Sequence, residues 1–189
     1  ADPLASQLLA RGVEAVVVDA FDPRTAARVI DLSGLADDRS VEEAIEAQKK
    51  VFAAARAVAQ STETPRFFIA VGDPFFGSPN AEWTGGIPGL IRTLALEAPE
   101  ITSRFIAVAK GRVEADRLAQ TVAAEILEGG ADLDIAIDSS GNRTAPFFED
   151  APALIDAEGA RPKLEDGSVL LVSGGARGVT ASCLEALAK

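Results

Sequence analysis

The feature that most constrains the fold is a regular alternation of short apolar runs with segments of helical length. The apolar runs span residues 13–20, 28–32, 66–71, 104–108 and 133–138. Segments with helical patterning or helix-end signals lie between most of them, at residues 40–60, 86–98 and 113–127. Continuous apolar runs are typical of strands buried on both faces, and strands that alternate with helices form a largely parallel sheet. The sequence therefore predicts an α/β fold with a Rossmann-like, mostly parallel sheet.

Local signals set several element bounds. Ser40 and Glu43 have the spacing of a capping box, which predicts a helix from there to about Gln60. Its larger apolar residues fall on one side, with two more valines beside them: Val41, Ile45, Phe52 and Ala55, then Val51 and Val58. Gly129-Gly130 predicts the end of a later helix. We also expect a short opening helix at residues 4–9 and an edge strand or hairpin partner at 143–148.

Composition excludes several classes of function. The 189 residues carry 18 Lys and Arg against 29 Asp and Glu, so the net charge is −11. This acidic balance argues against a nucleic-acid or membrane-surface partner, since either requires a basic face. No apolar run reaches about 18 residues, which argues against a membrane span. There is no His, which rules out a catalytic triad within these residues. A single cysteine fits a reducing, cytoplasmic location.

The strongest motif lies near the C-terminus. An apolar run at residues 169–172 leads into a glycine-rich turn, and the residues after it are typical of a helix start. A strand, a glycine turn and a helix N-terminus together place backbone N–H groups against a phosphate. The predicted cofactor-binding residues are Ser173, Gly174, Gly175, Ala176, Arg177, Gly178 and Val179. The alternative is an ordinary glycine-rich turn between a strand and a helix.

Other candidate residues each have a structural alternative. Arg177 can pair with the 2′-phosphate of NADP through its two-pronged guanidinium, or can be a solvated surface arginine. We predict that Cys183 is a buried, inert thiol, because no His is present to activate it. Asp132 and Asp134 suggest a metal or acid pair, but solvated ends of a sheet are the better interpretation. A long loop at 72–86 contains aromatic residues that can line a pocket, although covering a core or a partner surface is the better interpretation: Phe75, Phe76 and Trp83.

Two segments of the chain together resemble a known family. Residues 89–100 are similar to the G-L-x-R-(S/T)-L-x-x-E-x-P-E helix in the structural half of ketoreductase regions. Residues 169–179 read V-L-L-V-S-G-G-A-R-G-V and resemble the opening of the reductase half, which is a short-chain dehydrogenase/reductase. These regions belong to multifunctional polyketide, fatty-acid and polyunsaturated-fatty-acid synthases, and the glycine turn is most similar to the last type.

The resemblance implies two parts. Residues 1–160 would form a structural, truncated Rossmann-like subdomain that binds no nucleotide, and residues 161–189 would begin the NADP-binding catalytic subdomain. The parent protein would reduce β-ketoacyl thioesters on an acyl carrier protein with NADPH, and its catalytic Ser, Tyr and Lys would follow Lys189. The partners would be the remainder of the catalytic subdomain and the carrier protein. No catalytic residue and no metal site is assigned within the chain, which contains no Tyr.

Three interpretations of the chain remain open at this stage. It can be a piece of a ketoreductase, which the lack of an initiator Met favours, although engineered removal of a leader has the same result. It can be a purely structural interaction module whose exposed apolar surface favours self-association. It can also be a free-standing nucleotide- or CoA-binding protein of Rossmann-like fold.

Overall fold

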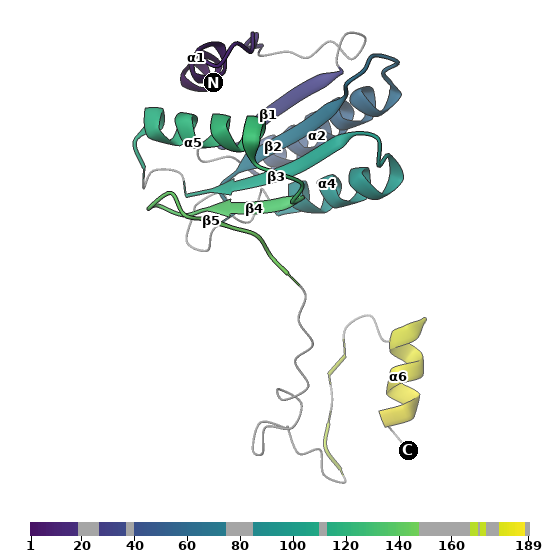
Figure 1. Ribbon diagram of the computed structural model, residues 1–189. Helices are drawn as coiled ribbons and strands as arrows, with labels where there is room; N and C mark the ends of the chain where they lie inside the picture. The colour runs from purple at the N-terminus through teal and green to yellow at the C-terminus, as the bar shows by residue number, and fades with distance from the viewer. Residues whose placement is uncertain are drawn as a thin grey trace. The chain divides into compact units, whose positions relative to one another are not determined.

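The computed structural model describes residues 1–18, 27–36, 40–74, 85–109, 113–147, 167–169, 171–172 and 178–187. The chain divides into two units, Ala1–Phe147 and Phe148–Lys189, each described here by itself (Figure 1). The predicted boundary between residues 160 and 161 lies outside the described residues and stays a prediction.

The first unit contains a five-stranded sheet whose strands follow one another in chain order. The strands are β1 (Arg28–Gly34), β2 (Phe67–Gly72), β3 (Thr102–Val108), β4 (Asp134–Ile137) and β5 (Arg143–Thr144). Strands β1 to β4 are parallel, and β5 pairs with β4 in the antiparallel direction. The structure therefore confirms the predicted α/β fold with a mostly parallel, Rossmann-like sheet. It also confirms a hairpin partner near residue 143, shorter than predicted.

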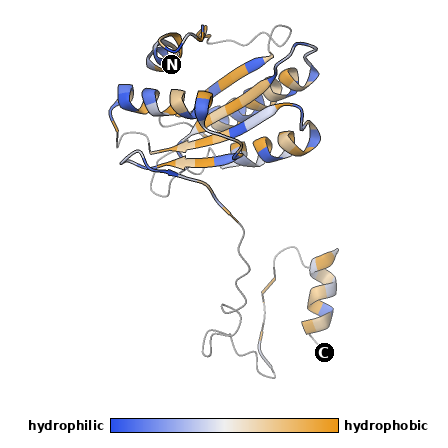
Figure 2. Ribbon diagram, in the orientation of Figure 1, coloured by the Kyte–Doolittle hydropathy of each residue, from blue (hydrophilic) through white to orange (hydrophobic). Residues whose placement is uncertain are grey.

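Among the described residues, four helices accompany this sheet: α1 (Asp2–Leu9), α2 (Val41–Gln60), α4 (Gly86–Glu97) and α5 (Ala115–Glu128). Helices α2 and α4 pack on one face of the sheet, and α1 and α5 pack on the other (Figure 1). Figure 2 shows the strands coloured mainly as hydrophobic and the helices as mixtures of both kinds. This pattern is expected when a sheet is covered on both faces and each helix buries only one side.

Alternate residues of the strands build two cores. Beneath α2 and α4 lie Phe68 and Ala70 of β2 with Phe105 and Ala107 of β3. Beneath α1 and α5 lie their neighbours along the same strands, together with isoleucines of β4: Ile69, Val71, Ile106, Val108, Ile135 and Ile137. Because successive side chains of a strand point to opposite faces, each apolar run supplies both cores.

The connection from β3 to β4 differs from the two before it. The strand order continues in one direction, yet α2 and α4 lie on one face and α5 lies on the other. This third crossover therefore has the opposite hand to the first two, whereas parallel crossovers are usually of one hand. As a result, the segment after β2 leads to a helix on one face of the sheet, and the segment after the adjacent strand β3 leads to a helix on the other face.

One predicted strand is absent. Residues 13–18 of the predicted run 13–20 have no regular secondary structure, and Val16, Val17 and Val18 are exposed. The last two residues of the run lie outside the described residues. A parallel strand needs neighbours for its backbone N–H and C=O groups, and β1 pairs only with β2 among the residues described here. An apolar, β-branched composition alone does not supply that neighbour.

Helix bounds follow the local signals closely. In α2, the Ser40 side chain accepts from the Glu43 N–H at 3.2 Å, and the Glu43 carboxylate accepts from the Ser40 N–H at 2.9 Å, so the predicted capping box is present. Helix α5 ends at Glu128, directly before Gly129 and Gly130. Gly130 has a φ of 75°, a left-handed conformation that glycine adopts without strain. None of the described helices is long and apolar enough to cross a membrane.

Candidate functional site

The predicted phosphate-binding turn lies mostly outside the described residues, because Ser173, Gly174, Gly175, Ala176 and Arg177 are not among them. Its last two residues are described. Gly178 has a φ of 70°, and Val179 is the first residue of α6 (Val179–Leu187). The predicted helix after the turn is therefore confirmed, together with a glycine in a left-handed conformation just before it.

The predicted strand before the turn is not formed. Val169, Leu171 and Val172 have no regular secondary structure and are exposed. Cys183 is also exposed, so the prediction of a buried thiol is wrong. Both differences have one cause: no residue of α6 is buried, and no strand among the described residues pairs with this run. A buried strand and the inner face of a helix both require a sheet to pack in.

The helix N-termini differ in whether they suit an anion. The first turn of α2 carries Glu42 and Glu43, and that of α5 carries Asp116. Carboxylates there interact favourably with the positive helix end and repel a phosphate. The first turn of α6 contains no acidic residue. The first turn of α4 also lacks one, but the Gln48 side chain lies against Gly86, with its Oε1 2.7 Å from where a Cβ would stand.

The carboxyl ends of β2 and β3 form the position where open α/β sheets usually bind ligands, because the chain leaves them toward opposite faces. Asp73 follows β2 directly and is buried, and its backbone N–H donates to the Gly34 carbonyl oxygen at 3.2 Å. Ala109 follows β3 and is buried as well. The residues that continue from these ends, 75–84 and 110–112, lie outside the described residues. Phe75, Phe76 and Trp83 are among them.

At the opposite, amino end of the sheet, ion pairs link strands to helices. Buried Arg104 of β3 pairs with buried Glu125 of α5 at 3.1 Å. Glu125 also pairs with Arg143 of β5 at 2.8 Å, and Arg143 reaches Asp132 at 2.7 Å. The hydrogen bonds to Glu125, and then to Asp132, raise the pKa of the Arg143 guanidinium above its ordinary value. These four residues are called the Arg104 cluster below.

The two aspartates singled out in the sequence therefore hold arginines. The Asp132 side chain is 51 % exposed, as predicted for a solvated end of the sheet. The Asp134 side chain is only 16 % exposed and pairs with Arg92 of α4 at 2.7 Å, so the prediction of a solvated carboxylate is wrong for Asp134. Within the described parts of the chain, no group of three or more His, Cys, Asp or Glu residues is placed to hold a metal ion.

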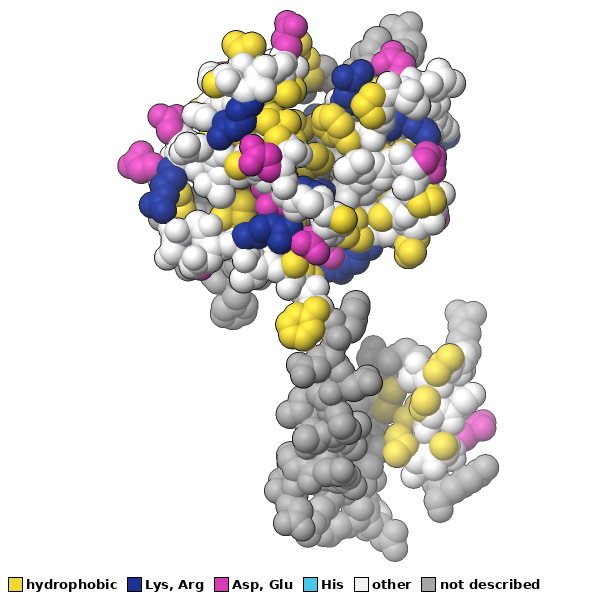
Figure 3. All heavy atoms as spheres, viewed as in Figure 1, with side chains coloured by type: hydrophobic (Ala, Val, Ile, Leu, Met, Phe, Trp, Pro, Cys, Tyr) yellow, Lys and Arg dark blue, Asp and Glu magenta, His cyan; other side chains and the backbone are white. Residues whose placement is uncertain are grey.

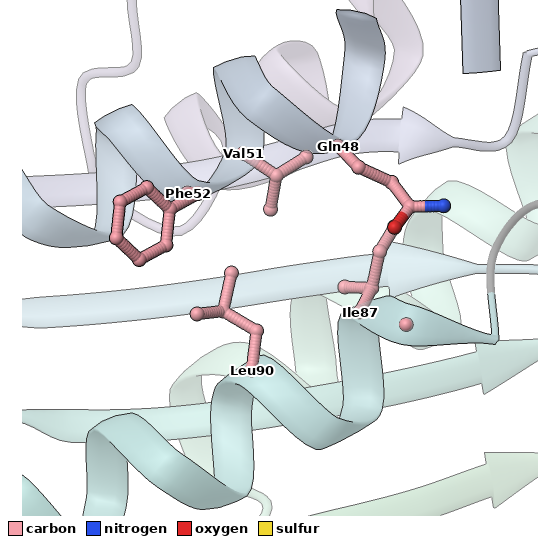
Figure 4. Close-up of a pocket in the computed structure, with 6 residues that line it drawn as sticks. Gln48, Val51, Phe52, Ile87 and Leu90 are labelled. Atoms are coloured by element: carbon pink, nitrogen blue, oxygen red, sulfur yellow. The ribbon is translucent and has the colours of Figure 1, made fainter. Parts of the chain in front are cut away.

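A surface hollow between α2 and α4 was not predicted from the sequence. Gln48, Val51 and Phe52 of α2 face Ile87 and Leu90 of α4 around a hollow of about 190 Å³ (Figure 4). The apolar spacing in α2 was visible in the sequence, but it does not show which residues the sheet covers. The structure buries Val51, Ala55 and Val58 and leaves Val41, Ile45 and Phe52 about half exposed.

The face of the sheet that carries α1 and α5 has a mixed surface, with charged side chains of both signs interspersed among apolar ones (Figure 3).

Comparison of the chain with protein-family models, with curated proteins and with solved structures found no match.

Proposed function

We propose that this chain is the structural half of a β-ketoacyl reductase from a multifunctional polyketide or fatty-acid synthase, followed by the opening of its NADPH-binding half. In the parent protein, NADPH would reduce the β-ketone of an acyl chain held as a thioester on an acyl carrier protein. The chain itself would be a non-catalytic scaffold. The observation that carries this proposal is the contrast between the acidic first turns of α2 and α5 and the acid-free first turn of α6.

This contrast separates a part suited to phosphate from a part that is not. In the five-stranded unit, the crossover helices α2 and α5 begin with carboxylates, and the Gln48 side chain lies at the start of α4. A pyrophosphate at α2 or α5 would meet negative charge. Ahead of α6, Gly178 has the left-handed conformation of a tight turn, and no carboxylate follows in the first turn. Ser173 to Val179 are therefore the residues proposed to hold the NADPH phosphates.

The helix that carries the family resemblance is used structurally, which also supports a scaffold. In α4, Ile91 and Leu94 are buried in the core beneath α2 and α4. Arg92 pairs with Asp134 of β4. Just after α4, Glu100 pairs with Arg66 at 2.9 Å, and Arg66 immediately precedes β2. Two charged residues of the motif, Arg92 and Glu100, thus pair with residues at strand ends and fasten α4 and its C-terminal turn to the sheet.

The proposal is tested in a longer polypeptide that adds one further domain, on the order of 200 residues, after Lys189. That protein should oxidise NADPH in the presence of a β-ketoacyl thioester, and removal of residues 1–147 should abolish the activity through loss of folded protein. A longer protein that folds and binds NADPH yet reduces no ketone would contradict the reductase assignment.

Arg177 gives a sharper test within the same protein. If its guanidinium pairs with the 2′-phosphate of NADPH, Arg177→Ala should weaken NADPH binding about tenfold or more and leave NADH binding nearly unchanged. Calorimetric titration with both nucleotides measures this difference. An equal loss for NADPH and NADH would remove Arg177 from the phosphate site.

A further inference from the structure

The outer side of α2 exposes an apolar row. Val41, Ile45 and Phe52 have exposed fractions of 50 %, 49 % and 55 %. Their separations of four and seven residues place them along one stripe of the helix. The stripe lies directly beside the buried Val51 and Ala55. The apolar face of α2 is therefore wider than the part of it that the sheet and α4 cover.

The row is hollowed at its centre. A depression of about 360 Å³ is lined by Ile45, Gln48, Lys49 and Phe52, and it adjoins the smaller hollow toward α4 (Figure 4). With a rise of 1.5 Å per residue, Ile45 and Phe52 are about 10 Å apart along the helix. Gln48 and Lys49 lie between them along the helix and line the depression.

Charge along α2 changes sign at Gln48. All acidic residues of the helix lie before Gln48 and all basic residues lie after it: Glu42, Glu43 and Glu46, then Lys49, Lys50 and Arg56. Three charges of each sign leave the helix neutral overall, in a chain whose net charge is −11. The face of α2 is therefore a place where two copies of an acidic protein can approach without net repulsion.

We infer that this face binds a second copy of the chain, with the two α2 helices antiparallel about a two-fold axis near Gln48 and Lys49. This arrangement places Phe52 of each copy beside Ile45 of the other. It also places Glu42 opposite Arg56, since the two lie equally far from Lys49. Both side chains are exposed, and neither has an ion-pair partner within the described part of the chain.

The charge division favours a second copy over a partner of another kind. A two-fold contact near Gln48 and Lys49 pairs the acidic N-terminal part of α2 with the part that carries Arg56, so Glu42 meets Arg56 at both ends. A partner with one sign of charge would be repelled by one of these two parts. A 20-residue helix is about 30 Å long. Together with the exposed edge of α4, the area that this face can bury is near the lower limit for stable dimer interfaces. The dimer should therefore be reversible, with a Kd of about 1–100 μM. This inference does not depend on the proposed reductase function.

Charge-reversal variants of the full 189-residue chain test the inference. Sedimentation velocity from about 1 μM to about 300 μM should show a monomer converting to a dimer. Arg56→Glu should weaken the dimer at least about tenfold, because it creates two like-charge pairs with Glu42. The double variant Glu42→Arg with Arg56→Glu should recover most of that loss. A merely structural role of either residue would not produce such recovery.

A second pair of variants tests whether the dimer depends on the row itself or on any exposed hydrophobic side chain. Phe52→Ser should abolish the dimer at these concentrations, whereas Leu96→Ser, at an exposed position of α4 outside the row, should not weaken it. Circular dichroism of each variant checks that the monomer is folded. A monomer at every concentration, or a dimer that Arg56→Glu leaves unchanged, would overturn the inference. A monomer whose Phe52→Ser variant shows a shifted Trp83 fluorescence would also overturn the inference. Such a shift would mean that another segment of the same chain covers this face.

Discussion

At the scale of single residues, the Arg104 side chain is held by hydrogen bonds to several parts of the chain. Its guanidinium donates to the carbonyl oxygens of Asp132, Glu125 and Gly130 as well as to the Glu125 carboxylate. It thereby satisfies carbonyl groups at the C-terminal end of α5 and in the turn that leads to β4. A cation at this position also interacts favourably with the negative end of the helix. The Arg104 cluster thus fixes where α5 stops and β4 begins.

Glu125→Gln should lower the free energy of unfolding by about 3 kcal/mol, because it leaves buried Arg104 without its counter-charge. The side chains of Arg104 and Glu125 are each only 6 % exposed, so water cannot replace the lost partner. Urea denaturation measures the change. Glu128→Gln is the matched control, an exposed acid at the end of the same helix, and should change stability by less than about 0.5 kcal/mol. Similar losses in both variants would contradict the role given to the cluster.

Asp138 should titrate below its ordinary pKa of 3.8 in the folded protein. The side-chain hydrogen bond from Asn142 is the main cause, followed by backbone N–H donors of the turn between β4 and β5. A lowered pKa means that this contribution to stability is present above about pH 4 and is lost as the pH falls through the folded value. In an NMR titration, Asn142→Ala should move the pKa of Asp138 up toward 3.8. An unchanged pKa would show that the side-chain bond is not the main cause.

At the scale of elements, α2 depends on its first turn. Ser40→Ala removes the side-chain acceptor for the Glu43 N–H and should cost about 1 kcal/mol of stability. Thr62→Ala, just beyond the other end of the helix, provides a control at an exposed residue and should cost less than about 0.5 kcal/mol. Chemical denaturation of the two variants side by side measures both. Equal effects would mean that the capping box contributes nothing specific.

Elements whose signals are local could be predicted from the sequence, and those that need a distant neighbour could not. The capping box, the glycines after α5 and the four parallel strands β1 to β4 all agree with the sequence. Residues 13–18 and 169–172 are mainly apolar like β2, but the described residues among them have no pairing strand in the described part of the chain. The exposed row on α2 was missed for a related reason, since periodicity shows the apolar side of a helix but not how much of it the sheet covers.

The candidate site could be predicted only in part. The glycine pattern correctly indicated a helix after the turn, which the structure begins at Val179, because a turn and a helix start are local features. The departure of the chain from the ends of β2 and β3 toward opposite faces could not be predicted, since it depends on the opposite hand of the β3–α5–β4 crossover. The partners of Asp134 and Glu125 are likewise set by tertiary structure, because Arg92 and Arg104 are far from them in the sequence.

At the scale of the whole molecule, we expect the two units to have different roles. The unit Ala1–Phe147 has a sheet covered on both faces and crossover helices α2 and α5 that begin with carboxylates. The unit Phe148–Lys189 holds the glycine turn and α6, none of whose residues is buried. We therefore expect the first unit to fold without a nucleotide and the second to bind one only when further strands complete its sheet.

An NADPH titration by calorimetry tests this division most directly, with the 189-residue chain and with the polypeptide extended by one domain beyond Lys189 measured side by side. We predict no binding heat for the chain alone and saturable binding for the extended protein. Saturable binding of NADPH by the chain alone would contradict this prediction, because a complete nucleotide site would then exist within these residues.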